Sequence, residues 1–132
     1  MNALDALLGA RPISEITKKV TIDRLGTDFT VKALSTEDVA QLREEATYYV
    51  GDGAKRKAQM NQEQLGLLMI VKATVEPDFK DKALLAHFDA KTAAQCVQKA
   101  LLASEFNTLT QAVVEVSGLT APTAEDIEEA KN

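Results

Sequence analysis

Residues 65–75, LGLLMIVKATV, carry apolar side chains on nearly every side of a helix, and this stretch constrains the fold more than any other. A helix that is apolar all round is buried on nearly all sides. Asn61 can cap its first turn, with Gln64 three positions later. Pro77 disfavours helical geometry at the residue before it, so the helix has to end there. The pattern predicts a central helix over residues 62–75.

Before this helix, apolar residues recur at every second position, as in a strand, rather than about every 3.6 positions, as in a helix. A turn sequence rich in Gly and Asp separates two runs of alternating apolar residues, which is typical of a β-hairpin. We expect strands near residues 14–22 and 28–34. A short helical segment at residues 3–8, ALDALL, can precede the hairpin. The alternating residues are Ile16, Val20 and Ile22 in the first strand and Phe29 and Val31 in the second.

Helical spacing returns at Ser35, which stands where an N-cap would, with acids in the first turn after it. We expect this helix to run to about Tyr49 and a polar loop to continue to Asn61. After Pro77, capping residues start further helices. Gly118 is a natural residue to follow the last of them. These helices are expected over residues 82–88 after Asp81, 93–101 after Thr92, and 104–116 after a restart of the pattern at Ser104.

Composition supports helix packing in a single domain. The chain has 132 residues and is 45% hydrophobic, yet aromatics reach 5% and Trp is absent, so the core must be aliphatic. We predict an α+β fold that is mostly α, with an N-terminal β-hairpin (14–34) followed by a compact bundle of about five helices (36–118). The predicted domain spans residues 1–119, and a flexible acidic tail spans residues 120–132.

Charge excludes some partners. The net charge is −5, and the one basic run, Lys55-Arg56-Lys57, is short and lacks interleaved aromatics. A nucleic-acid binder needs clustered Lys and Arg to displace counterions from phosphates, so we expect no nucleic-acid binding. No apolar run approaches the ~20 residues that span a bilayer, and the N-terminus lacks the pattern of a secretory signal. We therefore expect no membrane partner and a cytoplasmic location.

The residues that carry chemistry are few. His87 is the only histidine and Cys96 the only cysteine, and they lie nine residues apart across a predicted helix break. A zinc site usually takes three or four ligands of these types. Cys96 lies on the apolar face of its helix, where burial raises the pKa of a thiol and makes it inert. We expect no catalytic residues, no metal and no cofactor, and hence no enzyme.

Three stretches together resemble the XkdN-like tail assembly chaperones of long-tailed phages and prophages. A hairpin leads into Leu34-Ser35-Thr36-Glu37-Asp38, similar to the family's L-S/T-x-E-D/E. The apolar helix ends in Ala73-Thr-Val-Glu-Pro-Asp-Phe79, the most specific element. The third stretch is Val113-Val-Glu-Val-Ser-Gly-Leu119, which is similar to the family's ending of two helices followed by Ser-Gly. The resemblance runs from about Ile13 to Leu119.

This resemblance implies a non-enzymatic role. Such chaperones bind the tape measure protein and keep it soluble until the tail tube forms around it. They act in the host cell cytoplasm and are absent from the mature virion. A longer form made by ribosomal frameshifting recruits tail tube subunits in many of these phages, and the acidic tail lies where that junction is expected. A homo-oligomer is also possible. Two alternatives stay open, namely a structural tail or head-tail connector protein, and a host cytoplasmic adaptor domain.

A holdase needs apolar surface that its own fold does not use, together with net charge. Three apolar residues crowd into a stretch with only short elements to cover them, and we predict that they bind the partner. Two interpretations of the first of them remain, since it could instead pack against the central helix as an anchor of the turn. These residues are Phe79, Leu85 and Phe88.

Overall fold

The computed structural model describes residues 2–119, so the predicted acidic tail at 120–132 lies outside the described residues. The first hairpin pairs β1 (Thr17–Ile22) with β2 (Thr27–Lys32) in antiparallel register, with Thr17 opposite Lys32. A 3-10 turn at residues 23–25 joins them and ends at Gly26, whose φ of +66° suits a residue without a side chain. Of the alternating apolar residues, Val20, Ile22, Phe29 and Val31 point into the core. Ile16 does not, because residues 13–15 form a 3-10 turn, the first strand begins only at Thr17, and Ile16 is 45% exposed.

The helix α2 (Thr36–Glu45) begins as predicted at Ser35. The Ser35 hydroxyl accepts a hydrogen bond from the backbone N–H of Asp38 at 3.1 Å, and the Asp38 carboxylate accepts one from the backbone N–H of Ser35 at 3.0 Å. This reciprocal pair satisfies two backbone donors that the first turn leaves unpaired. The predicted end at Tyr49 is wrong, because α2 ends at Glu45 and the chain continues as a strand.

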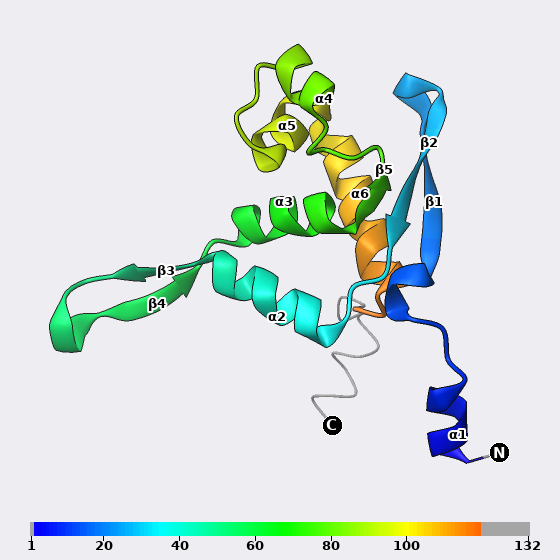
Figure 1. Ribbon diagram of the computed structural model, residues 1–132. Helices are drawn as coiled ribbons and strands as arrows, with labels where there is room; N and C mark the ends of the chain where they lie inside the picture. Colours follow the sequence, from blue (N-terminus) through cyan, green and yellow to red (C-terminus); the bar gives the residue numbers. More distant parts are fainter. Residues whose placement is uncertain (1, 120–132) are drawn as a thin grey trace, which may run out of the picture.

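A second hairpin follows α2, where the sequence predicted the last helical turn and a polar loop. It pairs β3 (Thr47–Val50) with β4 (Lys57–Met60), from Thr47 opposite Met60 to Val50 opposite Lys57. β-branched and aromatic residues dominate β3, and their preference for strands prevails over the helical spacing. Figure 1 shows this hairpin projecting from the body between α2 and α3, and we call residues 47–60 the arm.

The central helix α3 (Gln62–Ala73) is buried at Leu65, Leu67, Met69, Ile70 and Ala73. Asn61 caps it, since its side-chain oxygen accepts from the backbone N–H of Gln64 at 3.0 Å. The helix ends at Ala73 rather than Val75, because residues 74–76 leave it as β5 (Thr74–Glu76). This strand pairs antiparallel with β2 and makes a three-stranded sheet in the order β1-β2-β5.

Three helices complete the described chain, which is predominantly helical and confirms the α+β class. They are α4 (Lys82–His87), α5 (Ala93–Ala100) and α6 (Ala103–Val116). In Figure 1, α6 runs beside the sheet, α3 extends from the arm to β5, and α4 and α5 lie together at one end. Contacts of α3 with α5 and α6, and of α6 with β1 and β2, enclose one core. The largest fully buried side chains are Ile70, Leu109, Val31, Val97 and Val113.

Another element stands off from this core. The short helix α1 (Ala3–Leu8) lies away from the body in Figure 1. Its leucines Leu4, Leu7 and Leu8 are 64–76% exposed. None of the helices within residues 2–119 combines the length and the apolar character that crossing a bilayer requires.

Candidate functional site

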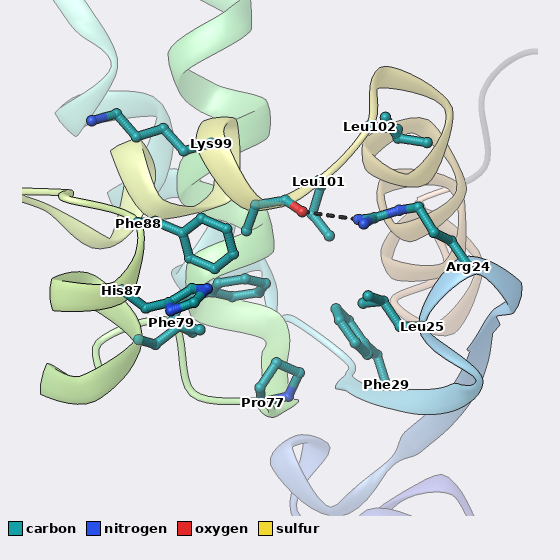
Figure 2. A pocket seen from close by; sticks show the side chains of 12 residues that line it. Arg24, Leu25, Phe29, Pro77, Phe79, His87, Phe88, Lys99, Leu101 and Leu102 are labelled. Atoms are coloured by element: carbon teal, nitrogen blue, oxygen red, sulfur yellow. Dashed lines mark hydrogen bonds between the residues drawn. The ribbon is translucent and has the colours of Figure 1, made fainter.

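An apolar cavity opens where the turn of the first hairpin meets α4 and the junction between α5 and α6. Its volume is about 510 Å³, within the range of ligand and peptide pockets. Figure 2 shows the rings of Phe79, His87 and Phe88 on one side, and the Leu25 side chain and the Phe29 ring near the other. The remaining lining comes from Arg24, Pro77, Leu84, Lys99, Ala100, Leu101 and Leu102.

The cavity has an aromatic floor. The Phe79 ring meets the Phe29 ring at 6.3 Å between centroids and 63° between planes, which is the edge-to-face arrangement that aromatic pairs prefer. Phe79 is 2% exposed and Phe29 is 5% exposed, so both rings also belong to the core. Phe88 is half-buried, and its ring meets His87 edge-on at 4.8 Å. This floor holds its shape because β2 and the β5–α4 loop fix it from two sides.

One end of the cavity is held by an ion pair that joins the first hairpin to α6. Arg24 donates from Nε and Nη2 to the two carboxylate oxygens of Glu105 at 2.8 and 2.7 Å, and from Nη2 to the Ala100 carbonyl at 3.0 Å. Glu105 also accepts from the backbone N–H of Leu102 at 2.8 Å. The Arg24 bonds, followed by the Leu102 bond, lower the pKa of the Glu105 carboxyl, and the same carboxylate raises the pKa of Arg24.

The rim of the cavity carries positive charge. Lys99 donates from Nζ to the backbone carbonyl of Asp89 at 2.7 Å. Among residues 2–119 it has no carboxylate within ion-pair distance. The Arg24 charge, in contrast, is compensated by Glu105. The cavity thus combines an apolar interior with Lys99 at its edge, and Figure 2 shows the ammonium group of this residue directed away from the interior.

The structure places the three predicted partner-binding residues differently. Phe79 lies in the core beneath the cavity, Phe88 lines one wall, and Leu85 is half-buried against the core without lining the cavity. Phe79 is buried and its ring packs on Phe29 of the first hairpin, whereas the alternative interpretation places it against the central helix. Whether these side chains contact a partner stays a prediction.

The two residues considered for chemistry differ in exposure. Cys96 is fully buried in α5, and burial raises the pKa of its thiol. His87 is exposed at the end of α4. Across the described range, no three His, Cys, Asp or Glu side chains gather closely enough to hold a metal ion.

The three stretches quoted from the sequence have structural roles. Ser35 and Asp38 cap α2, and Phe79 packs on the first hairpin. At the end of α6, the Ser117 hydroxyl accepts from the backbone N–H of Leu34 at 2.8 Å. Gly118 follows with φ +72°, while the backbone N–H of Leu119 donates to the carbonyl of Val114 at 2.8 Å, which closes the helix. Each motif joins elements that are far apart in the chain.

A small α+β fold with an apolar cavity of this size is suited to binding an apolar group of a ligand or partner. The chain belongs to the phage XkdN-like tail assembly chaperone family, whose sequence pattern matches residues 4–131. It is therefore a phage tail assembly chaperone, which interacts with phage tail components and acts in the host cell during assembly. This is an assembly family rather than a family of enzymes.

The fold is also similar to the crystal structure of the protein yqbn, a structural genomics target. The two chains align with a TM-score of 0.58 and 19% sequence identity, over 77% of this chain and 86% of that chain. At this identity the similarity shows the fold alone. No curated protein sequence matches the chain.

Several features of the site escaped sequence analysis. Arg24 and Glu105 lie 81 positions apart, and Lys99 lies on the polar side of an ordinary amphipathic helix. Pairing between distant residues leaves no periodic signal in one sequence. A local signal did exist for Glu105, because it stands three residues after Leu102 in the position from which a Glu side chain binds the N-cap backbone.

Proposed function

We propose that this chaperone binds the tape measure protein through the apolar cavity and keeps it soluble during tail assembly. The observation that carries this proposal is the cavity itself, with an aromatic floor and partly exposed walls. An amphipathic helix of a partner could insert an apolar side chain there, as helices do in hydrophobic grooves. The half-exposed Leu25 and Leu102 extend the apolar surface around its mouth.

A pair of equally exposed residues tests this proposal. Leu25 lines the cavity and Ile13 lies outside it, and both are 46% exposed. Co-expression with the tape measure protein of the same phage, followed by pull-down, should show loss of binding for Leu25→Asp and parental binding for Ile13→Asp. Both variants should keep the parental melting temperature. Parental binding by Leu25→Asp would assign the partner to another surface.

We further propose that a frameshift-extended form of the chain recruits tail tube protein, and that residues 1–119 form the chaperone domain with residues 120–132 as a tail. The family pattern reaches residue 131 and so includes most of that tail. Mass spectrometry of infected cells should detect peptides that join the residues before Asn132 to a longer product. If infected cells contain the short form and not a longer product, this part of the proposal is wrong.

We propose, finally, that the chaperone is absent from the mature virion. Family membership favours this role over a structural tail or connector protein and over a host adaptor. Abundant peptides of this chain in purified particles would identify it instead as a structural protein.

A further inference from the structure

The arm is a part of the described molecule that its own fold supports weakly. β3 and β4 form a two-stranded sheet by themselves, so each has an outer edge with no neighbouring strand within residues 2–119. An isolated two-stranded hairpin is marginally stable in water. Backbone donors and acceptors along such an edge are a template for pairing with another strand.

The arm also exposes large side chains on both faces. Tyr48, Tyr49 and Val50 are 47%, 58% and 47% exposed. Successive residues of a strand point to opposite faces, so Tyr48 and Val50 share one face and Tyr49 lies on the other. Contacts within the arm leave these groups half uncovered, although Tyr48 donates to the Gln59 side chain at 2.9 Å and Arg56 lies 4.0 Å above the Tyr49 ring.

Charge is distributed unevenly along the arm. The tip carries Lys55, Arg56 and Lys57 against one acid, Asp52, whereas the root carries Glu44 and Glu45 against one base, Arg43, and all of these are exposed. Five extended residues separate root from tip, about 17 Å. This exceeds the screening distance of about 8–10 Å at physiological salt, so the two ends do not neutralise each other. A partner that matches the arm must present acidic groups near the tip and basic groups near the root.

We propose that the arm pairs with the arm of a second copy of this chain, through the outer edges of the two β3 strands. In an antiparallel pair the tip of each arm lies beside the root of the other, and a two-fold axis repeats the contact. The result is a four-stranded sheet in the order β4-β3-β3-β4. This inference is independent of the tape measure proposal, because the apolar cavity lies on other elements.

The strand sequence selects one register. With Tyr49 opposite Tyr49 of the second copy, Tyr48 lies opposite Val50 in both directions, and paired residues share a face. Aromatic pairs and pairs of aromatic with β-branched residues stabilise antiparallel strands. The same register places residues 53 and 54 alongside Glu45 and Glu44 of the second copy. The contact is small compared with a standard interface, so we expect a dimer that dissociates on dilution.

Charge reversal tests the pairing without disturbing the core. We expect the tip variant Lys55→Glu/Lys57→Glu and the root variant Glu44→Lys/Glu45→Lys each to remain monomeric in sedimentation velocity at concentrations where the parent dimerises. An equimolar mixture of the two should form a heterodimer, because each arm then matches the other. The control Lys80→Glu/Lys82→Glu makes the same charge change outside the arm and should dimerise like the parent.

A cysteine tests the register. In the proposed pair the two Tyr49 Cα atoms are close enough for a disulfide. Tyr49→Cys should therefore give a covalent dimer on mild oxidation, whereas Ile13→Cys, at an exposed position elsewhere, should stay monomeric. A parent that is monomeric at all concentrations would overturn the proposal, as would a dimer that survives both charge reversals. Cross-linking of both cysteine variants alike would overturn the register.

Discussion

Phe79 is a residue whose burial makes its substitution measurable as stability. Its ring is 2% exposed and packs against Phe29, so truncation leaves a cavity between β2 and the loop before α4. We expect Phe79→Ala to reduce the free energy of unfolding by about 3–5 kcal/mol. Urea unfolding followed by circular dichroism measures this change. Phe88→Ala, at a half-buried ring, should lose clearly less, and equal losses would contradict the packing described here.

Glu105 makes stability depend on pH. Arg24 and the Leu102 backbone lower the pKa of its carboxyl in the folded state below the usual value of about 4.3. Near and below that value the unfolded chain binds the proton more readily, so stability rises with pH in this window. The contribution of Glu105 is complete above about pH 4.3 and is lost as the pH falls through its folded pKa.

We therefore expect Glu105→Gln to lower the melting temperature at pH 7 and to flatten the loss of stability as the pH falls below about 4.3. Melting curves across this range measure both effects. Glu37→Gln, at an exposed position on α2, is the control and should keep the parental profile. A Glu105→Gln profile parallel to that of the parent at every pH would show that other carboxylates dominate the acid response.

The thiol of Cys96 should be unreactive in the folded protein. It is fully buried in α5, and burial raises the pKa of its thiol, which keeps it protonated at neutral pH. A thiol reagent should react slowly with the native protein and rapidly after unfolding in urea. Equal rates in the two conditions would mean that α5 opens readily.

At the scale of elements, the end of α6 is joined to the end of β2 by one side chain. The Ser117 hydroxyl accepts from the backbone N–H of Leu34, and Leu34 is 3% exposed. Removing the hydroxyl leaves a buried donor unpaired, which costs about 1–3 kcal/mol. Ser117→Ala should lose this amount in urea unfolding, whereas Ser104→Ala, at an exposed position, should lose little. Equal effects would show that water replaces the lost acceptor.

Helix starts were predictable because capping is local. Ser35, Asn61, Asp81 and Thr92 each accept a backbone hydrogen bond within three residues, so the signal lies within four residues of sequence. Strand pairing is not local in this way. The β5 strand is three residues long and gains its hydrogen bonds from β2, more than 40 positions earlier. The end of α3 therefore differs from the predicted one because residues 74–76 pair with β2, and the sequence of α3 itself does not indicate this pairing.

The sequence did not predict the arm, and the reason is different. Thr47 to Val50 favour a strand, but Ala46 and Tyr49 continue the helical spacing of α2, and the two signals conflict in the same five residues. The partner strand Lys57–Met60 is too short to give a clear signal, because its only apolar residues are Ala58 and Met60, and three of its four residues are exposed. Of the apolar cavity, the sequence indicated the side that Phe79 and Phe88 form. The side around Arg24 depends on a contact across 81 positions.

At the scale of the whole molecule, burial differs strongly between the body and its extensions. Ile70 and Ala73 of α3 and Val31 of β2 have no exposed surface, whereas every residue of β3 except Thr47 is exposed. Local opening requires little free energy where few apolar contacts are lost. The arm should therefore open many times while the body stays folded, and its openings should not depend on global stability.

Native-state hydrogen exchange measures this difference residue by residue. At low protein concentration the amides of β3 and β4, like those of α1, should exchange fast and those of α3 and β2 slowest, with small amounts of urea accelerating only the slow set. If two arms pair through β3, the outward-facing amides of β3 should slow as the protein is concentrated, while the amides of α4 stay unchanged. Uniform protection across arm and body would contradict the independence of the arm, because only an arm packed on the core could share its stability.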